Sequence, residues 1–453
     1  MSLSTLPTPT SPPLVLFPDT LYDIPLSLMH PYKTIYIVED PNYFTMWPFT
    51  KIKLAYMRAC MQAYFKELVN KQKKKKKKTN VIYIESVGFP NFFNKLKECT
   101  MYYPNDLALK KRYEEKAKIT YIYDCPNFLL SVDDELYKNE KTIKRHSAFY
   151  RRMKDKFNLL QSTKNQDKLN RSKPSQDYKV PVRPKYSSSS EYLNAAKYVF
   201  KKFSNNPGPH KSPEDLVKYL TYYPITRSQS AKHFKYFLDN YYSGFKFQDY
   251  IDKDEVFVNH SNISCVLNNG LLSAKNVIQD AYNYGKKKNI AINNIEGFIR
   301  QILGWREYMR YVYHIECNEM NMKQYNKIHS VRLTERFWNS SSNNLVVYEE
   351  YEKVMKYGYS HHIVRLMVFL NMMKLKNIQI EDIIEWFSCV HIDAYPWVMY
   401  SNVLAMGYYN KGYMSKAYVS SSNYIVKNSN YKKNGEWDKE WDRLYRIFVS
   451  KKI

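Results

Sequence analysis

The chain has 453 residues, 44% of them hydrophobic and 16% aromatic, which suffices for two or three packed domains and argues against global disorder. Lysine and arginine number 70 against 43 acidic residues, and the net charge of +27 favours a polyanionic partner, although an AT-rich coding sequence would raise the lysine count as well. The six cysteines form no CxxC pair and no run of 18 apolar residues occurs, which argues against a zinc ribbon, a disulfide framework and a membrane span, and indicates a reducing compartment, the cytoplasm or the nucleus.

The first part of the chain alternates predicted strands with a predicted helix. Residues 1–13 are rich in Ser, Thr and Pro and lack the basic and apolar regions of a signal peptide, so we expect a disordered tail. Short β-branched or aromatic runs predict strands over 14–17, 34–38, 81–84 and 119–123, and the stretch 51–68 predicts a helix. This order predicts a Rossmann-like α/β domain over 14–160, with a parallel sheet covered by helices. The lysine run 73–78 is interpreted as a solvated loop, with a DNA contact as the alternative.

The second part of the chain is predicted to be helical. Residues 140–160 are basic with a helical pattern, and residues 161–190 are polar and rich in Pro and Ser, which indicates a loose interdomain linker. Helical patterns then dominate, over 191–205, 212–220, 227–243, 273–287, 295–315, 345–375 and 380–388. Since no strand alternation of note follows the linker, the pattern predicts an all-α domain over 191–453.

A loop with small polar side chains precedes one of these helices. His260, Ser261 and Ser264 are followed by the amide- and Gly-containing stretch 267–272, just before the helix expected from 273. Free backbone N–H groups at such a turn can hold a phosphate. An ordinary helix N-cap explains the same pattern and is the simpler interpretation.

The stretch 296–310 predicts an amphipathic helix with an unusual glycine content. One face holds Phe298, Ile302, Trp305 and Met309. Gly297 and Gly304 lie seven residues apart, and each glycine costs a helix about 1 kcal/mol. Core packing rarely retains two of them, so we expect them to let a flat or large group approach; a plain core helix is the alternative.

A third segment combines two histidines with a candidate ion pair. His361 and His362 are neighbours, and on one helix their side chains would point about 100° apart, so they do not easily bind one metal ion and no metal site is expected. Arg365 and Asp393 are a candidate buried ion pair, an arrangement that needs a strong local reason to exist.

Together these segments resemble the cryptochrome/photolyase family, and within it the iron–sulfur bacterial branch, the prokaryotic (6-4) photolyases. The similar stretches keep the family's order and spacing: NHSNIS…NNGLL at 259–272, EGFIRQILGWREYMR at 296–310, GYSHHIVRLM at 358–367, DAYPWV at 393–398 and AYVSSSNYI at 417–425. Weaker similarities at 18–21, 128–131 and 149–153 extend the resemblance over nearly the whole chain.

The resemblance implies an antenna chromophore of unknown identity in the Rossmann-like domain and an all-α photolyase domain that binds FAD. It implies that the residues that contact the cofactor are His260, Ser261, Ser264, Glu296, Arg300, Trp305, Arg306, Arg365, Asp393 and Asn402. It further implies that the catalytic residues facing a flipped lesion are His361, His362 and Tyr418, and that Trp338 and Trp386 transfer electrons. A lesion must leave the base stack to meet the flavin, and a histidine is suited to proton transfer near neutral pH.

The sequence departs from this family at three places. Val346 and the segment 431–441 stand where the family has the four cysteines of its [4Fe–4S] cluster, so no iron–sulfur cluster is expected. Met399 stands where the family has an acidic residue facing the flavin, and a thioether cannot shuttle a proton. Phe387 replaces a tyrosine of the electron-transfer path.

Two functions follow from the resemblance, and a third interpretation is a relic that binds no flavin and is retained for structure or interaction. The first is a monomeric, FAD-dependent enzyme that uses light to repair (6-4) photoproducts in UV-damaged DNA. The alternative is a cryptochrome-like or degenerate homologue that binds flavin or DNA without repairing it, which Met399 and the missing cysteines favour.

Overall fold

The computed structural model describes residues 11–29, 31–73, 79–122, 125–138, 145–161, 166–175, 177–187, 189–316, 330–334, 344–408 and 418–450. The chain forms two compact units, each assembled from several stretches of sequence. Unit 1 consists of Met1–Asp134, Pro184–His233 and Ile263–Val277, and unit 2 of Glu135–Arg183, Phe234–Asn262 and Ile278–Ile453. The boundaries of the predicted linear domains, at 160 and 190, therefore remain a prediction.

Unit 1 contains a five-stranded parallel sheet with the strand order β3-β2-β1-β4-β5. The strands are β1 (Leu14–Leu16), β2 (Thr34–Val38), β3 (Asn80–Ile84), β4 (Glu98–Tyr102) and β5 (Lys118–Ile122). The register places Val15 opposite Tyr36 and Leu14 opposite Thr100. The predicted parallel sheet is confirmed; β4 was missed, and Tyr123 of the last predicted strand lies outside the described residues.

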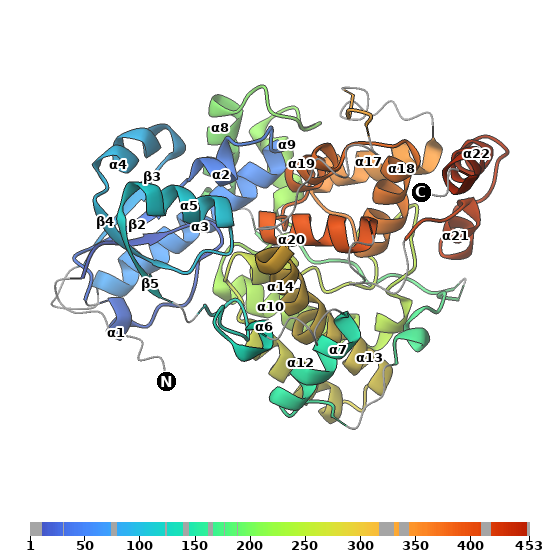
Figure 1. Ribbon diagram of the computed structural model, residues 1–453, viewed down its shortest axis with the longest axis horizontal. Helices are drawn as coiled ribbons and strands as arrows, with labels where there is room; N and C mark the ends of the chain where they lie inside the picture. The colour runs from blue at the N-terminus through green and yellow to red at the C-terminus, as the bar shows by residue number, and fades with distance from the viewer. Residues whose placement is uncertain are drawn as a thin grey trace. The chain divides into compact units, whose positions relative to one another are not determined.

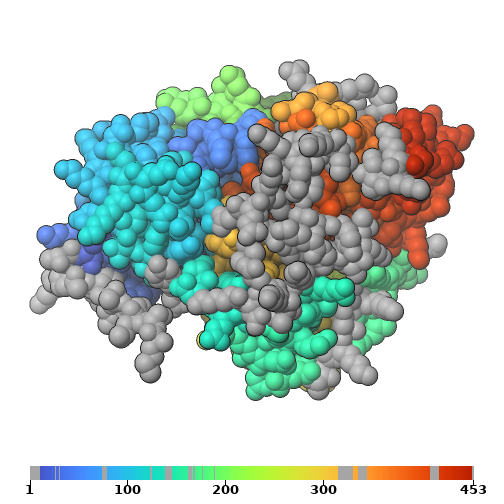
Figure 2. Space-filling view, viewed as in Figure 1, coloured from blue at the N-terminus to red at the C-terminus, as the bar shows by residue number. Residues whose placement is uncertain are grey.

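Unit 1 also contains helices. They are α1 (Leu26–Met29), α2 (Pro41–Phe44), α3 (Lys51–Lys73), α4 (Phe89–Lys95), α5 (Leu107–Lys116), α8 (Ser190–Lys202), α9 (Pro213–Leu220) and α11 (Ser264–Asn268), with the 3₁₀ turn η1 (Ser86–Gly88). In Figure 1, α5 lies in front of the strands, and its residues form part of the surface seen in Figure 2. The Asp106 side chain caps α5 by accepting the N–H groups of Ala108 and Leu109, which fixes where this helix begins.

Within the described residues, the regular secondary structure of unit 2 is helical apart from the isolated bridges Ile251–Ser429 and Val331–Ile378. Its elements are α6 (Glu135–Lys138), α7 (His146–Lys156), η3 (Asp167–Asn170), η4 (Tyr242–Phe247), α13 (Ile292–Ile299), η5 (Arg300–Arg306), α14 (Glu307–Glu316), α17 (Leu345–Tyr357), η6 (Val364–Leu370), α18 (Asn371–Leu375), α19 (Ile380–Val390), α20 (Pro396–Asn402), η7 (Val403–Gly407), α21 (Ser422–Lys427) and α22 (Trp437–Ser450). Helices α10 (Arg227–Asn240) and α12 (Ala274–Lys287) begin in unit 1 and end in unit 2. The predicted all-α architecture of this part is confirmed.

One prediction about unit 2 needs correction. The single helix expected over 345–375 is broken, because Gly358 ends α17 in the left-handed conformation with φ of 65°. The loose linker over 161–190 remains a prediction, although Asn170 within it is fully buried and its Nδ2 donates to the Asn293 carbonyl at 2.9 Å.

None of the helices in the described ranges combines the length and the apolar character that a membrane-spanning segment needs.

Candidate functional site

Three stretches of unit 2 are π-helical: η5, η6 and η7. The π-helix accounts for well under 1% of residues in globular proteins and occurs preferentially at functional sites. η5 contains three of the predicted cofactor-binding residues, η6 contains Arg365, and η7 begins directly after Asn402. The backbone irregularities therefore mark the same segments as the sequence pattern.

Trp305 and Arg306 connect η5 to α20. The indole Nε1 of Trp305 donates to Asn402 Oδ1 at 3.0 Å, and Asn402 Nδ2 donates to the Val398 carbonyl at 2.7 Å. The Arg306 guanidinium, 8% exposed, lies 5.1 Å from the centre of the Trp397 ring, a cation–π contact. Helices α14 and α20 pack side by side next to these contacts (Figure 1). The structure thus brings together three residues that the resemblance assigned to the cofactor.

Arg365 and Asp393 form the ion pair that the sequence predicted. Nη1 of Arg365 lies 3.0 Å from Asp393 Oδ1, and Nη2 donates to Oδ2 at 3.1 Å. Nε of Arg365 also donates to the Ser360 carbonyl at 2.7 Å. This two-pronged geometry satisfies both charges in a place where Asp393 is only 6% exposed.

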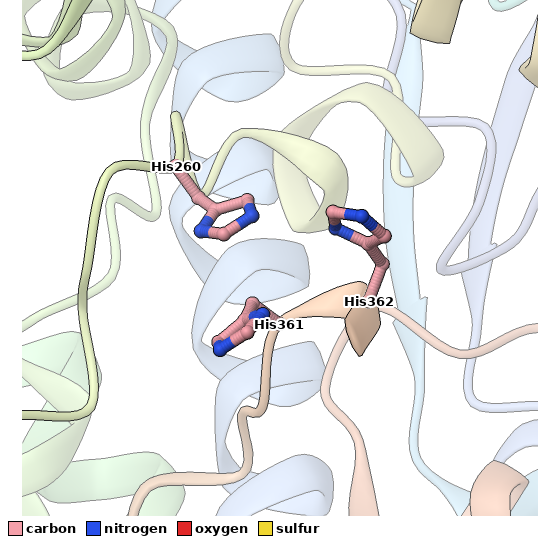
Figure 3. A group of neighbouring side chains, drawn as sticks. All are labelled: His260, His361 and His362. Carbon is pink, nitrogen blue, oxygen red and sulfur yellow. The ribbon is translucent and has the colours of Figure 1, made fainter. Parts of the chain in front are cut away.

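Three histidines of unit 2 gather at the start of this segment (Figure 3). The rings of His260 and His361 are stacked with centroids 4.7 Å apart, and the His362 ring is 5.3 Å from His260 and 6.1 Å from His361 at a steep angle to both. His260 lies on the loop before α11, and the helical turn that leads into η6 begins only at His362. The assumption that His361 and His362 share one helix is therefore wrong.

The two stacked imidazoles are neutral. Burial lowers the pKa of His260 and of His361 well below the usual 6.5, and the neighbouring charges of His362 and Arg365 lower both further. A backbone group of Gln248 opposes this shift at His260. All four ring nitrogens of the pair are buried, and none has a partner at hydrogen-bonding geometry among the described residues. A buried polar group without a partner costs about 1–3 kcal/mol, so the fold maintains an unfavourable arrangement here that a ligand would relieve.

His362 differs from its two neighbours in exposure. Its side chain is 47% exposed, and its Nε2 lies 3.4 Å from Oδ1 of Asp249, which is 15% exposed. The cluster is therefore closed at His361 and open to solvent at His362. An acidic residue orients the ring at the open end.

Glu296 and Arg300 lie on the same helix one turn apart. Glu296 is fully buried, its Oε1 is 3.8 Å from Arg300 Nε, and its Oε2 accepts the backbone N–H of Gln166 at 3.4 Å. Burial raises the pKa of Glu296, partly offset by Arg300. In this arrangement Glu296 holds the segment after α7 in place.

The expectation for Gly297 and Gly304 needs correction. A Cβ at Gly297 would lie 2.3 Å from the Asn170 amide nitrogen, and one at Gly304 would lie 2.8 Å from the Tyr150 ring. The groups that approach this helix closely are therefore the protein's own side chains. Core packing explains both glycines.

The remaining predicted site residues are spread over different surroundings. Ser261 offers its carbonyl to Arg183 Nη1 at 3.4 Å, whereas Ser264 begins α11 and belongs to unit 1. Tyr418 is half-buried. Trp386 is fully buried, 4.9 Å from the Phe369 ring, and Trp338 lies outside the described residues.

Two residues next to the histidine cluster were not predicted from the sequence. Arg183 donates to the His260 carbonyl at 2.6 Å and lies 4.5 Å from the Tyr241 ring centre, and Asp249 faces His362. Arg183 is far from the histidines in sequence, Asp249 precedes His260 by eleven residues, and neither lies in a pattern of its own. No local signal could have identified them.

A second polar cluster lies in unit 1, after the carboxyl ends of β1, β2 and β4. Asp19, Asp40 and Asp106 are buried there, with Arg112 paired to Asp40. Burial and the nearby Asp106 raise the pKa of Asp19 to about 7. In open parallel sheets, ligands bind beyond the carboxyl ends of strands where the strand order reverses, which here is between β1 and β4.

Comparison with known proteins gives these features a family context. Residues 14–214 match the family described as deoxyribodipyrimidine photo-lyase-related protein. Over 300 residues the chain is 28% identical to the (6-4) photolyase of Agrobacterium fabrum, and this match covers 62% of the chain and 56% of the length of that protein. The chain is related to the cryptochrome/photolyase family.

Solved structures of photolyases have the same fold. One is the crystal structure of a bacterial class III photolyase from Agrobacterium tumefaciens. The match covers 99% of this chain and 88% of the photolyase chain, with a TM-score of 0.54 and 15% sequence identity. Another is the crystal structure of an archaeal photolyase from Sulfolobus tokodaii with two FAD molecules. That match covers 97% of this chain and 94% of the archaeal chain, with a TM-score of 0.52 and 14% sequence identity. At these identities the photolyase relatives share the Rossmann-like sheet and the helical part with this chain.

Proposed function

We propose that this protein binds FAD and uses light to repair UV-damaged DNA, with (6-4) photoproducts as the lesion. The observation that supports this most directly is His361, which is 4% exposed and has no hydrogen-bond partner on either ring nitrogen in the described part of the chain. It is followed four residues later by the Arg365–Asp393 ion pair. A pocket that binds a flipped base needs polar atoms of this kind left free for the ligand.

The residues of unit 2 fit a flavin in their chemistry. A flat ring with polar edges requires aromatic faces and buried hydrogen-bonding groups, and the pairs Trp305–Asn402 and Arg365–Asp393 supply both within helical elements. A buried ion pair is rarely maintained for stability alone, because its desolvation cost approaches its Coulombic gain. Bound FAD would supply the light-driven electron transfer, and Arg306, Arg365, Asp393 and Asn402 would hold and orient it.

His361 and His362 would have different tasks at the lesion. The neutral His361 can accept a proton or donate its one ring N–H, and its burial excludes water from its side of the pocket. His362 reaches solvent and is oriented by Asp249, so it can exchange protons with the exterior. Tyr418 would complete the pocket.

Met399 favours a second function, the binding of flavin and DNA without repair. This side chain is 5% exposed on α20 and offers only a thioether where relatives are expected to place an acid. Such a protein would bind FAD and damaged DNA and yield no light-dependent product.

We further propose that the protein contains no iron–sulfur cluster. Val346 and the segment 431–441 contain no cysteine, and Trp437 and Trp441 fill the interior there with rings 6.2 Å apart. Four thiolates are needed to bind such a cluster. Iron analysis of the purified protein should therefore find none.

The remaining parts of the proposal concern partners and place. UV-damaged DNA is the proposed partner, since a net charge of +27 favours a polyanion. We propose a monomer in the cytoplasm or nucleus. We also propose that the buried polar cluster around Asp19 in unit 1 is the place for an antenna chromophore.

Release of the cofactor tests the proposal first. Denaturing the protein, after reconstitution with excess FAD, should release FAD that is identified by its absorption and mass. Arg306→Ala should lower the FAD content, and the exposed Arg443→Ala should leave it unchanged. If no FAD is retained even after reconstitution, the proposal is wrong.

A further inference from the structure

The three-histidine cluster has a property that neither the lesion pocket nor the flavin requires. We propose that His260, His361 and His362 bind one divalent transition-metal ion, such as zinc. The inference stands on the geometry of these residues alone and does not depend on the repair function.

The donor atoms are close enough to share one ion. One ring nitrogen from each histidine lies within 4.8 Å of the other two. Zinc binds imidazole nitrogen at about 2.0–2.1 Å, so tetrahedral ligands lie about 3.3 Å apart. The cluster must therefore contract by roughly 1.5 Å, which is within reach of side-chain rotation.

The stacked pair is able to make this movement. A metal ion lies in the plane of each imidazole that binds it, so the parallel rings of His260 and His361 must turn relative to one another. Among the described residues, no partner at hydrogen-bonding geometry holds the ring nitrogens of His260 or His361 in place. Coordination would also satisfy one nitrogen of each ring.

Asp249 supplies the outer partner that metal-binding histidines usually have. Its Oδ1 lies 3.4 Å from His362 Nε2, which leaves Nδ1 of that ring available as the ligand. A carboxylate on the far nitrogen of a ligating histidine fixes the ring and increases its basicity, and its loss typically weakens metal binding 10–100-fold.

The charges around the cluster indicate which ions it would accept. Arg365 and Lys353 lie nearby but are paired with Asp393 and Glu350, and Arg183 donates to the His260 carbonyl. The three donor groups are neutral nitrogens, which suit zinc, cobalt, nickel and copper, whereas magnesium and calcium require oxygen ligands. Three protein ligands leave a fourth position open, as in catalytic zinc sites.

Metal titration of the whole chain tests the inference without DNA or light. Metal-stripped protein should bind one zinc ion by calorimetry and one cobalt(II) ion with the visible absorption of a tetrahedral site, and it should not bind magnesium there. His361→Ala and His260→Ala should each abolish the cobalt spectrum. Asp249→Asn should weaken zinc binding about 10–100-fold.

His314→Gln is the matched control, because it removes a histidine of the same unit outside the cluster, and it should leave zinc affinity unchanged. Circular dichroism of each variant separates loss of the site from loss of the fold. The inference is overturned if the folded wild-type protein binds no zinc, or if zinc binds equally well after the cluster histidines are replaced. Neither outcome affects FAD content or repair, so failure here is distinguishable from failure of the proposed function.

Discussion

Asp19 is 3% exposed beyond the carboxyl end of β1, and burial with the neighbouring Asp106 raises its pKa from 3.8 to about 7. The folded chain therefore retains a proton that the unfolded chain releases above pH 3.8. The contribution of Asp19 to the free energy of unfolding is fully present below pH 3.8. It falls as the pH rises from 3.8 to about 7, and it is absent above pH 7. Across this window, each pH unit lowers the free energy of unfolding by at most about 1.4 kcal/mol.

We predict that Asp19→Asn flattens this pH dependence. The variant should be more stable than the wild type by about 2–4 kcal/mol at pH 8 and similar to it at pH 4, because the amide never has to ionise. Urea unfolding at both pH values measures the difference. Asp23→Asn is the control, since that side chain is 70% exposed, and it should show no such gain at pH 8.

We predict that Asp393→Asn destabilises unit 2 by about 3 kcal/mol, because it leaves the Arg365 guanidinium buried beside a neutral amide. The exposed helical pair Lys235–Asp239 provides the comparison, and Asp239→Asn should cost less than about 0.5 kcal/mol. Denaturant unfolding of the two variants gives both values. Equal costs would show that burial does not determine the strength of the Arg365–Asp393 pair.

At the scale of residues, the sequence was a better guide to the Arg365–Asp393 ion pair than to the cluster of three histidines. Arg365 and Asp393 were a candidate buried ion pair, and they do form one. The stacking of His260 on His361 was not foreseen, since the two residues are a hundred positions apart and belong to different matched segments. Tertiary packing alone determines this contact.

The helix formed by α13 and η5 shows how the role of a glycine can be misinterpreted from sequence. Its two glycines suggested room for a ligand, yet the side chains of Asn170 and Tyr150 occupy that space. A glycine in a sequence indicates close approach without identifying the approaching group.

We predict that Gly297→Ala destabilises the protein by about 1–3 kcal/mol, although alanine is the better helix former by about 1 kcal/mol. Its Cβ would meet the Asn170 amide at 2.3 Å. Chemical denaturation measures the cost, and Asn170→Ala in the same chain should recover part of it.

Gly88→Ala is the control for this substitution. A Cβ there would have only the Ile84 side chain near it, at 4.0 Å, so the change should be close to neutral. If Gly297→Ala stabilises the chain instead, Asn170 can move away, and the helix retains its glycine for another reason.

The boundaries of helices and strands were predicted best where the apolar residues form a clear pattern along the chain. The first three strands of the sheet stand out because each is a compact run of mostly apolar, β-branched or aromatic residues. β4 was missed because it begins with Glu98 and follows Lys97, so its hydrophobic run is too short to detect. The break in the helix predicted over 345–375 depends on one left-handed residue, Gly358.

At the scale of the whole molecule, the net charge of +27 makes a prediction about DNA. Affinity for duplex DNA should fall about 1,000-fold or more between 50 and 200 mM salt if six or more phosphates are contacted. A (6-4)-containing duplex should bind more tightly than an undamaged one, because a damaged pair costs less to unstack. Fluorescence anisotropy across a salt series measures both effects.

Replacing His361 and His362 together by alanine separates the two contributions. The salt-dependent component should persist, and the preference for damaged DNA and any light-dependent product should disappear. Equal affinity of the wild-type protein for both duplexes, with no product under light, would favour the function without repair.

The interleaving of the two units has a consequence for synthesis on the ribosome. The strands of unit 1 emerge early, but the unit also needs Pro184–His233 and Ile263–Val277, so it cannot be completed until well over half of the chain has been translated. Domains often fold in sequence from the N-terminus at the pace of translation. Here the sheet emerges long before the last segments of its unit, which makes the nascent chain a candidate for chaperone binding during that interval.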